Sequence, residues 1–113
     1  MAGNGSAGPQ KQRRRHLRVK VAVTIELLIE KYATPLRGRT SDLSLGGCYV
    51  ESMFTLELGT QVKVTLWLND AKVVTEGVIV TRHIQVGNGI QFTNMSAQDS
   101  ATLRKFLATA PEM

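Results

Sequence analysis

The sequence predicts a mainly β protein: a six-stranded antiparallel barrel, or strongly bent sheet, with one helix at its C-terminal end. Three observations support this fold. Short apolar runs recur at the spacing of β-hairpins, apolar and polar residues alternate in the first run, and the last apolar segment changes to a helical period. Short, closely spaced strands are typical of antiparallel barrels, and a single amphipathic helix can cover an open end.

The first strand has the clearest pattern, because every second residue from 19 to 27 is apolar and the residues between them are mainly polar. Further strands are expected over residues 36–42, 48–51, 62–68, 73–81 and 90–92. Ser96 followed by Asp99 predicts a helix N-terminus. The apolar stripe that would face the barrel recurs at helical spacing and consists of Leu103, Phe106, Leu107 and Ala110.

Turn residues predict where the strands are joined. Asn69-Asp70 predicts a tight hairpin, and Gly87-Asn88-Gly89 predicts the turn before the last strand. Gly77, inside the fifth strand, predicts either a bulge or a close approach to a neighbouring part of the chain. Phe54 and Leu56 lie between the third and fourth strands. We expect both in the core, with an exposed edge for a partner as the alternative.

The charge of the chain is concentrated at one end. Of the 113 residues, six basic ones precede the first acid, Glu26, whereas 8 basic and 9 acidic residues follow from there onward. We therefore expect a flexible leader over residues 1–12, with a basic arm leading into one domain over residues 13–110. No apolar stretch approaches the ~18 residues of a membrane-spanning helix. One cysteine allows no intrachain disulfide, and we expect a cytoplasmic protein.

Two short motifs carry the functional signal. Arg14 and Arg18 form an Arg-x-x-x-Arg spacing before the first strand, and Asp42-Leu43-Ser44-Leu45-Gly46-Gly47 forms an Asp-x-Ser-x-x-Gly turn between two strands. Guanidinium groups match phosphate oxygens and the O6/N7 edge of guanine, and a carboxylate accepts from guanine N1–H and N2–H₂. Gly46 and Gly47 would permit a positive φ and let a ligand approach the backbone. Each motif alone is more often a solvated basic run or an ordinary turn, so their combination carries the interpretation.

In this order, the two motifs resemble those of the PilZ domain, a bacterial receptor module for cyclic di-GMP. The resemblance covers about residues 11–108 and includes a Gly-aliphatic-x-Phe element at residues 89–92 and a closing helix. By position, it implies that the ligand-binding residues are Arg14, Arg18, Asp42, Ser44 and Gly47, with Gly46 beside them. Arg13 stands where an arginine in this family tends to accompany two stacked ligand molecules. The family often has proline where this chain has Leu17.

Further contacts are expected from Arg15, and from Arg82 or His83, either of which could stack on a guanine because no tryptophan lies near the fifth strand. His16, His83 and Cys48 do not have the spacing of a metal site, and no arrangement of residues supports catalysis. The sequence therefore predicts a non-enzymatic receptor without a metal or resident cofactor. Its partners would be cyclic di-GMP, with two molecules per chain expected from Arg13, and an unidentified downstream protein.

Two other functions remain as alternatives at this stage. The basic arm could bind nucleic acid without regard to sequence, although the near-neutral body makes this the weaker interpretation. The chain could also be a PilZ-type adaptor that binds no ligand and works through protein contacts. Such an adaptor has no need for both intact motifs, which favours the receptor.

Overall fold

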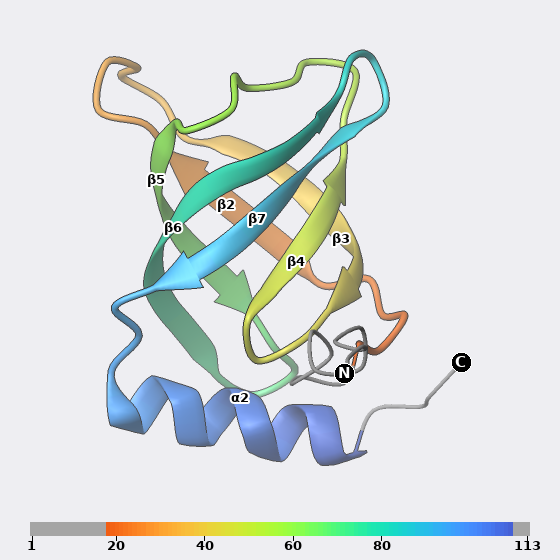
Figure 1. The fold of residues 1–113 in the computed structure, drawn as a ribbon. Helices are drawn as coiled ribbons and strands as arrows, with labels where there is room; N and C mark the ends of the chain where they lie inside the picture. Colours follow the sequence, from red (N-terminus) through yellow and green to blue (C-terminus); the bar gives the residue numbers. More distant parts are fainter. Residues whose placement is uncertain (1–17, 110–113) are drawn as a thin grey trace, which may run out of the picture.

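The protein, in a computed structural model that describes residues 18–109, is a closed barrel of six antiparallel strands with a helix across one end (Figure 1). Around the barrel the strands follow the order β2-β3-β4-β7-β6-β5. The predicted fold class is confirmed. The elements are β2 (Thr24–Leu28), β3 (Leu36–Leu43), β4 (Gly47–Glu51), β5 (Gln61–Trp67), β6 (Lys72–His83), β7 (Gly87–Thr93) and α2 (Ala97–Thr109).

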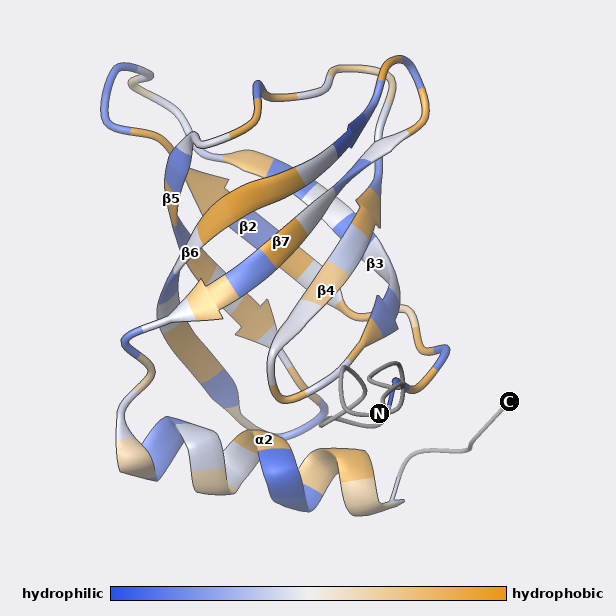
Figure 2. Cartoon of the chain, viewed as in Figure 1, coloured by the Kyte–Doolittle hydropathy of each residue, from blue (hydrophilic) through white to orange (hydrophobic). Residues whose placement is uncertain are grey.

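The core fills the inside of the barrel with aliphatic side chains. Apolar and polar residues alternate along the strands, as Figure 2 shows, so each strand turns one face inward. The side chains with no exposed surface include Ile25, Val64, Leu66 and Val73, and neighbouring strands bring them together. Burial of this inward face drives the chain to close into a barrel.

The first predicted strand is divided in two. Regular pairing begins only at Thr24, and Val19 forms an isolated bridge with Leu43. Between these points, Thr40 of β3 replaces part of the ladder: its Oγ1 accepts from the Val23 amide at 3.0 Å and donates to the Val21 carbonyl at 2.7 Å. The alternating burial continues through this segment, although the strand does not.

The prediction of a turn at Gly87-Asn88-Gly89 is wrong, because these residues begin β7. The chain reverses earlier, where the Val86 amide bonds the His83 carbonyl at 2.8 Å and Gln85 has a φ of 67°. Gly87 is needed for space. A Cβ there would stand 2.7 Å from Cε2 of Tyr49 on the neighbouring strand.

The structure confirms one of the two expectations for Gly77 and not the other. A Cβ at Gly77 would lie 2.9 Å from Cγ2 of Ile90, so the close approach is confirmed. The irregularity in this strand pair lies instead between Ile79 and Thr81. The tight hairpin at Asn69-Asp70 is also confirmed, because the Leu68 amide bonds the Ala71 carbonyl at 2.8 Å.

Helix α2 closes the barrel end nearest the start of the described chain (Figure 1). The Ser96 hydroxyl accepts from the Asp99 amide at 3.0 Å, which confirms the predicted N-cap. Leu103 is fully buried, and Phe106 and Leu107 pack against the core, whereas Ala110 lies outside the described residues. A hollow of about 220 Å³ between α2 and the β3–β4 turn is lined by Val19, Leu45, Arg104, Leu107 and Ala108.

One predicted core residue lies on the surface. Phe54, in the β4–β5 connector, has 83% of its surface exposed, so its core assignment is wrong. Leu56 packs partly against the core, and its amide bonds Oδ1 of Asn88 at 2.8 Å. The connector is anchored through Leu56, while most of the Phe54 side chain is exposed to solvent. Within residues 18–109, no helix is long and apolar enough to cross a membrane.

Leu103 gives a test of how the helix contributes to stability. We expect Leu103→Ala to lower the free energy of unfolding by about 2–5 kcal/mol, because it removes a fully buried side chain and leaves a cavity. Urea unfolding would measure the change. The matched control is Arg104→Ala, at an exposed position one residue on, which should alter stability by less than about 0.5 kcal/mol. Equal losses in both variants would show that α2 does not seal the core through Leu103.

Candidate functional site

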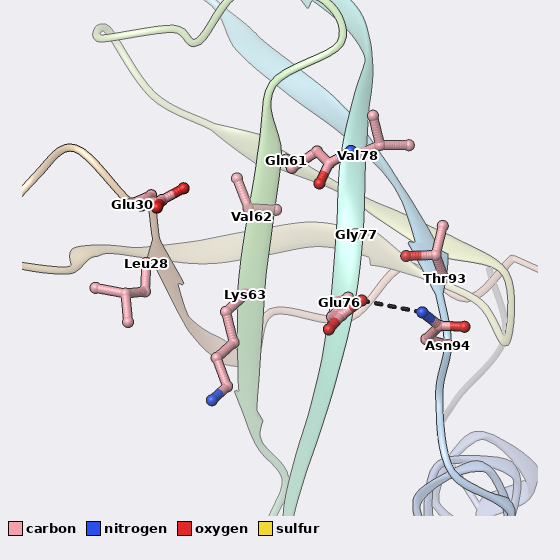
Figure 3. A pocket seen from close by; sticks show the side chains of 10 residues that line it. All are labelled: Leu28, Glu30, Gln61, Val62, Lys63, Glu76, Gly77, Val78, Thr93 and Asn94. Carbon is pink, nitrogen blue, oxygen red and sulfur yellow. Dashed lines mark hydrogen bonds between the residues drawn. The ribbon is translucent and has the colours of Figure 1, made fainter.

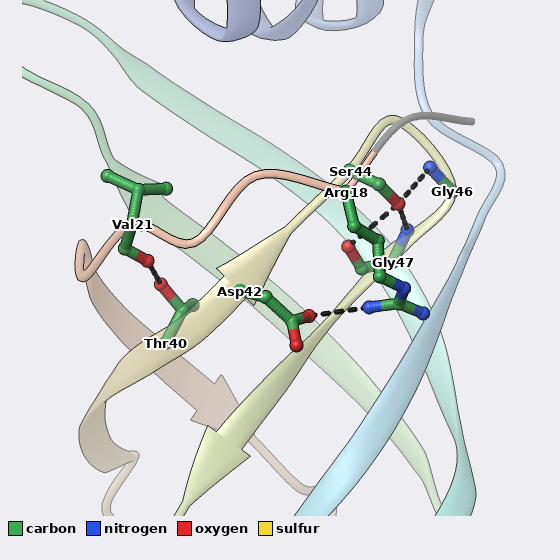
Figure 4. A network of polar contacts seen from close by, with 7 residues as sticks. All are labelled: Arg18, Val21, Thr40, Asp42, Ser44, Gly46 and Gly47. Carbon is green, nitrogen blue, oxygen red and sulfur yellow. Dashed lines mark hydrogen bonds and ion pairs between the residues drawn. The ribbon is translucent and has the colours of Figure 1, made fainter. Parts of the chain in front are cut away.

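An ion pair joins the two motifs on the outside of the barrel. Nη1 of Arg18 lies 2.5 Å from Oδ1 of Asp42, although the residues are 24 positions apart in the sequence (Figure 4). Their side chains are 49% and 23% exposed, so both remain accessible to a ligand. The structure thus brings together one arginine of the first motif and the carboxylate of the second.

The backbone explains how Arg18 reaches this place. Val19 and Leu43 exchange two main-chain hydrogen bonds, both of 2.9 Å, and both side chains are buried. Arg18 precedes Val19 and Asp42 precedes Leu43, so the paired backbones hold the two charged residues close together on the surface. A register shift between Thr40 and Asp42 marks the same stretch of β3.

Ser44 closes the turn of the second motif. Its buried hydroxyl accepts from the amides of Gly46 and Gly47, both at 3.1 Å, and lies 3.2 Å from the Gly47 carbonyl oxygen, to which it donates (Figure 4). The Ser44 amide bonds the same carbonyl at 2.8 Å. Asp42 and Ser44 therefore do not share a surface here: the carboxylate is outside and the hydroxyl is inside the turn. A direct ligand contact from Ser44 stays a prediction.

The two glycines of the motif have different roles. A Cβ on Gly47 would lie 2.2 Å from the Ile90 carbonyl oxygen, so only glycine fits there. The Gly46 carbonyl accepts from the Phe92 amide at 2.9 Å, which ties the turn to β7. Neither glycine uses the positive φ that it would permit, because among the glycines of residues 18–109 only Gly59 has one. The Gly-aliphatic-x-Phe element and the turn thus support each other.

Cys48 lies beneath the site. It is the register partner of Leu43 and almost fully buried. Burial raises the pKa of its thiol from 9.0 to about 12, the negative charge of Asp42 adds to the rise, and Arg18 opposes it. The thiol is therefore protonated at neutral pH and acts as a small apolar core group.

The other predicted site residues fall into two groups. Arg13, Arg14 and Arg15 lie outside the described residues. Arg82 and His83 lie at the end of β6, where Nε of Arg82 donates to Oγ1 of Thr55 at 3.0 Å. Roles for all five in ligand binding stay predictions.

Sequence reasoning missed Tyr49, which lies opposite Asp42 in the β3–β4 pairing. Its hydroxyl is 2.9 Å from Nδ1 of His83. A signal was present: Tyr49 stands between apolar Cys48 and Val50, so alternation places an aromatic ring on the outer face.

Another hollow lies elsewhere on the barrel and has a different character. It has a volume of about 700 Å³ and lies along β5 and β6, where Lys63, Glu76 and Asn94 are among the residues that line it (Figure 3). Glu30 adds a second carboxylate. Two acids against one base do not suit a phosphate ligand, so we place the candidate site at Arg18 and Asp42. Within residues 18–109, no three His, Cys, Asp or Glu side chains form a metal-binding group.

Comparison with known protein families shows to which family the chain belongs. The model of the PilZ domain matches residues 12–109. The chain belongs to the PilZ family. Both the closed six-stranded barrel and the closing helix agree with this assignment, and the resemblance inferred from the two motifs is confirmed.

Solved structures of PilZ domains share the fold at low sequence identity. The PilZ domain of YcgR from Escherichia coli with c-di-GMP has a TM-score of 0.69 and 18% identity, over 86% of this chain and 91% of that one. The PilZ domain of CeSA from a cellulose-synthesizing bacterium gives 0.65 and 20%, over 81% and 96%. The Bacillus subtilis inhibitor of motility MotI/DgrA gives 0.72 and 16%, over 89% and 55%.

These likenesses concern the fold. This chain spans about half the length of MotI/DgrA. Among curated protein sequences, none matches the chain.

The Cys48 thiol gives a pH test of the core beneath the site. Its pKa is higher in the folded state than in the unfolded state, so from about pH 9 the unfolded chain loses the proton first and stability falls as pH rises toward 12. We expect the wild type to lose on the order of 1 kcal/mol more than Cys48→Ala between pH 7 and pH 10. Urea unfolding at both pH values measures this difference. Identical losses would show that the thiol is not protected in the fold.

Proposed function

We propose that this protein is a non-enzymatic receptor for cyclic di-GMP in the bacterial cytoplasm. The observation that carries the proposal is the Arg18–Asp42 ion pair, which joins the two motifs at one accessible place on the barrel. The family assignment supports it. So do fold neighbours whose structures contain c-di-GMP or are described as c-di-GMP-dependent, namely the YcgR complex and the transcription regulatory factor MrkH.

The chemistry of the pair suits a guanine-bearing phosphate. The described contact of Arg18 with Asp42 uses Nη1 and Oδ1, which leaves further guanidinium N–H donors of Arg18 and the second oxygen of Asp42 for a ligand. Guanidinium groups bind phosphate or the O6/N7 edge of guanine in a bidentate manner, and a carboxylate accepts from N1–H and N2–H₂. The ion pair orients both groups before the ligand arrives, which reduces the entropy lost on binding.

The remaining ligand contacts in this proposal come from the basic arm. Arg14 supplies the second guanidinium of the motif, and Arg13 and Arg15 add positive charge beside it. Ligand phosphates neutralise charges that repel one another, so binding orders the arm over the barrel. The ordered arm forms the surface that acts on a downstream protein.

The first test removes the arginines. If each makes a bidentate contact worth about 1–3 kcal/mol, Arg14→Ala with Arg18→Ala should weaken cyclic di-GMP binding by roughly thirty-fold to twenty-thousand-fold. Calorimetric titration measures the affinity. The matched control is Arg37→Ala, which removes an exposed arginine that pairs with Glu26 on the outside of β3. This control should bind like the wild type.

Two further titrations separate the proposal from its alternatives. Cyclic di-AMP should bind much more weakly, because adenine has no N2–H₂ and presents an acceptor at N1 to Asp42. Duplex DNA should bind weakly, and any such binding should fall steeply with salt. Two results would overturn the proposal of a guanine-specific site. One is cyclic di-GMP binding by the Arg14→Ala, Arg18→Ala variant that equals binding by the wild type, and the other is equal affinity of the wild type for both cyclic dinucleotides.

Stoichiometry tests the role of Arg13. Two stacked ligands bring four phosphates and four guanines, more acceptor surface than Arg14 and Arg18 can cover, and Arg13 supplies a third guanidinium. We expect calorimetry to give two ligands per chain, falling toward one for Arg13→Leu with binding retained. A ratio of one in the wild type would remove the stacked pair and leave the receptor proposal intact.

A further inference from the structure

Two rings that are 34 residues apart form a pair on the outer wall of the barrel. The hydroxyl of Tyr49 lies 2.9 Å from Nδ1 of His83, and the ring centroids are 5.9 Å apart with planes tilted by 42°. The hydroxyl either donates to the neutral imidazole or accepts from its N–H, and both arrangements hold the Tyr49 ring in one orientation.

This ring pair stands next to the candidate site. Tyr49 is the register partner of Asp42 in the β3–β4 ladder. Its neighbours along β4, Cys48 and Val50, are buried in the core, so Tyr49 points outward, as Asp42 does. Cross-strand partners on one face have Cβ atoms about 4.5–5.5 Å apart, so a planar group whose edge meets the carboxylate also reaches the ring.

The strand beside Tyr49 is shaped to receive its ring. The ring crosses the outer face of β7 at Gly87, where a Cβ would lie 2.7 Å from Cε2 and 3.0 Å from Cζ. Any side chain at this position would displace it. Gly87 therefore explains why the ring can cross β7 and reach His83 on β6.

We propose that Tyr49, held by His83, is a further ligand-binding residue of the site: its ring stacks on the guanine that Asp42 reads. This inference rests on the proposed function. Aromatic side chains bind bases through their π-faces, and Asp42 recognises only the edge of a base. Stacking and edge recognition are perpendicular constraints, so together they fix both the plane and the rotation of the guanine.

The geometry favours Tyr49 over the stacking residues expected from the sequence. Nε of Arg82 is engaged by Thr55 in the β4–β5 connector, whereas His83 turns toward Tyr49. In this proposal His83 is a positioning residue, and Tyr49 contacts the base.

The test compares the two tyrosines of the chain by calorimetry with cyclic di-GMP. Tyr49→Ala should weaken binding by about five-fold to 150-fold, the usual range for removing one base–aromatic stack. Tyr49→Phe, which keeps the ring and loses the hydroxyl, should remain within a few-fold of wild type. Tyr32→Ala is the matched control, because Tyr32 is an exposed ring in the β2–β3 turn and should not affect binding.

A second measurement uses the wild-type protein and does not depend on whether Tyr49→Ala folds. In the complex, nuclear Overhauser effects should connect guanine H8 or the ribose H1′ to the Tyr49 ring protons, which a merely structural tyrosine would not give. A folded Tyr49→Ala that binds like wild type, or a complex without these contacts, would overturn the inference while cyclic di-GMP binding by the wild type stands. A wild type that does not bind cyclic di-GMP would instead overturn the proposed function, and the inference with it.

Discussion

The candidate site depends on two main-chain hydrogen bonds between Val19 and Leu43. They hold the segment that carries Arg18 against β3 before the regular strand begins. Both side chains are buried, so hydrophobic packing and the hydrogen bonds act at the same point. The charged pair outside contributes little to stability, since exposed ion pairs are worth ~0–1 kcal/mol. The core therefore places Arg18 and Asp42, and in the proposed function these two side chains bind the ligand.

One pair of strands forms both the core and the site, because side chains alternate between the two faces. Leu43 and Cys48 face inward, and the adjacent pair of Asp42 and Tyr49 faces outward. A slip of one residue in this register would bury the carboxylate and expose the core. The turn closed by Ser44 prevents such a slip, since its hydrogen bonds to the two glycine amides set the length of the β3–β4 connection. The main structural effect of the Asp-x-Ser-x-x-Gly motif is therefore to fix the β3–β4 register.

Much of this fold could be read from local patterns. The alternation around Ile25 predicted an inward face, and Ser96 predicted the start of the helix, because each signal depends only on neighbouring residues. The glycines at 87 and 89 were misread as a turn, since their close packing comes from strands that only the three-dimensional structure brings near. The contact between Tyr49 and His83 could not be predicted for the same reason, because the two residues are far apart in the sequence. The motif residues were found, but the structural role of Ser44 was not.

The hollow between α2 and the β3–β4 turn shows that the described chain begins and ends at the same place. Val19 lies at one side of this hollow, and Leu107 and Ala108 lie at the other. A short linker could join these ends while a new break is made at the exposed Asn69-Asp70 hairpin, because neither change interrupts a strand pairing. The topology is therefore compatible with circular permutation.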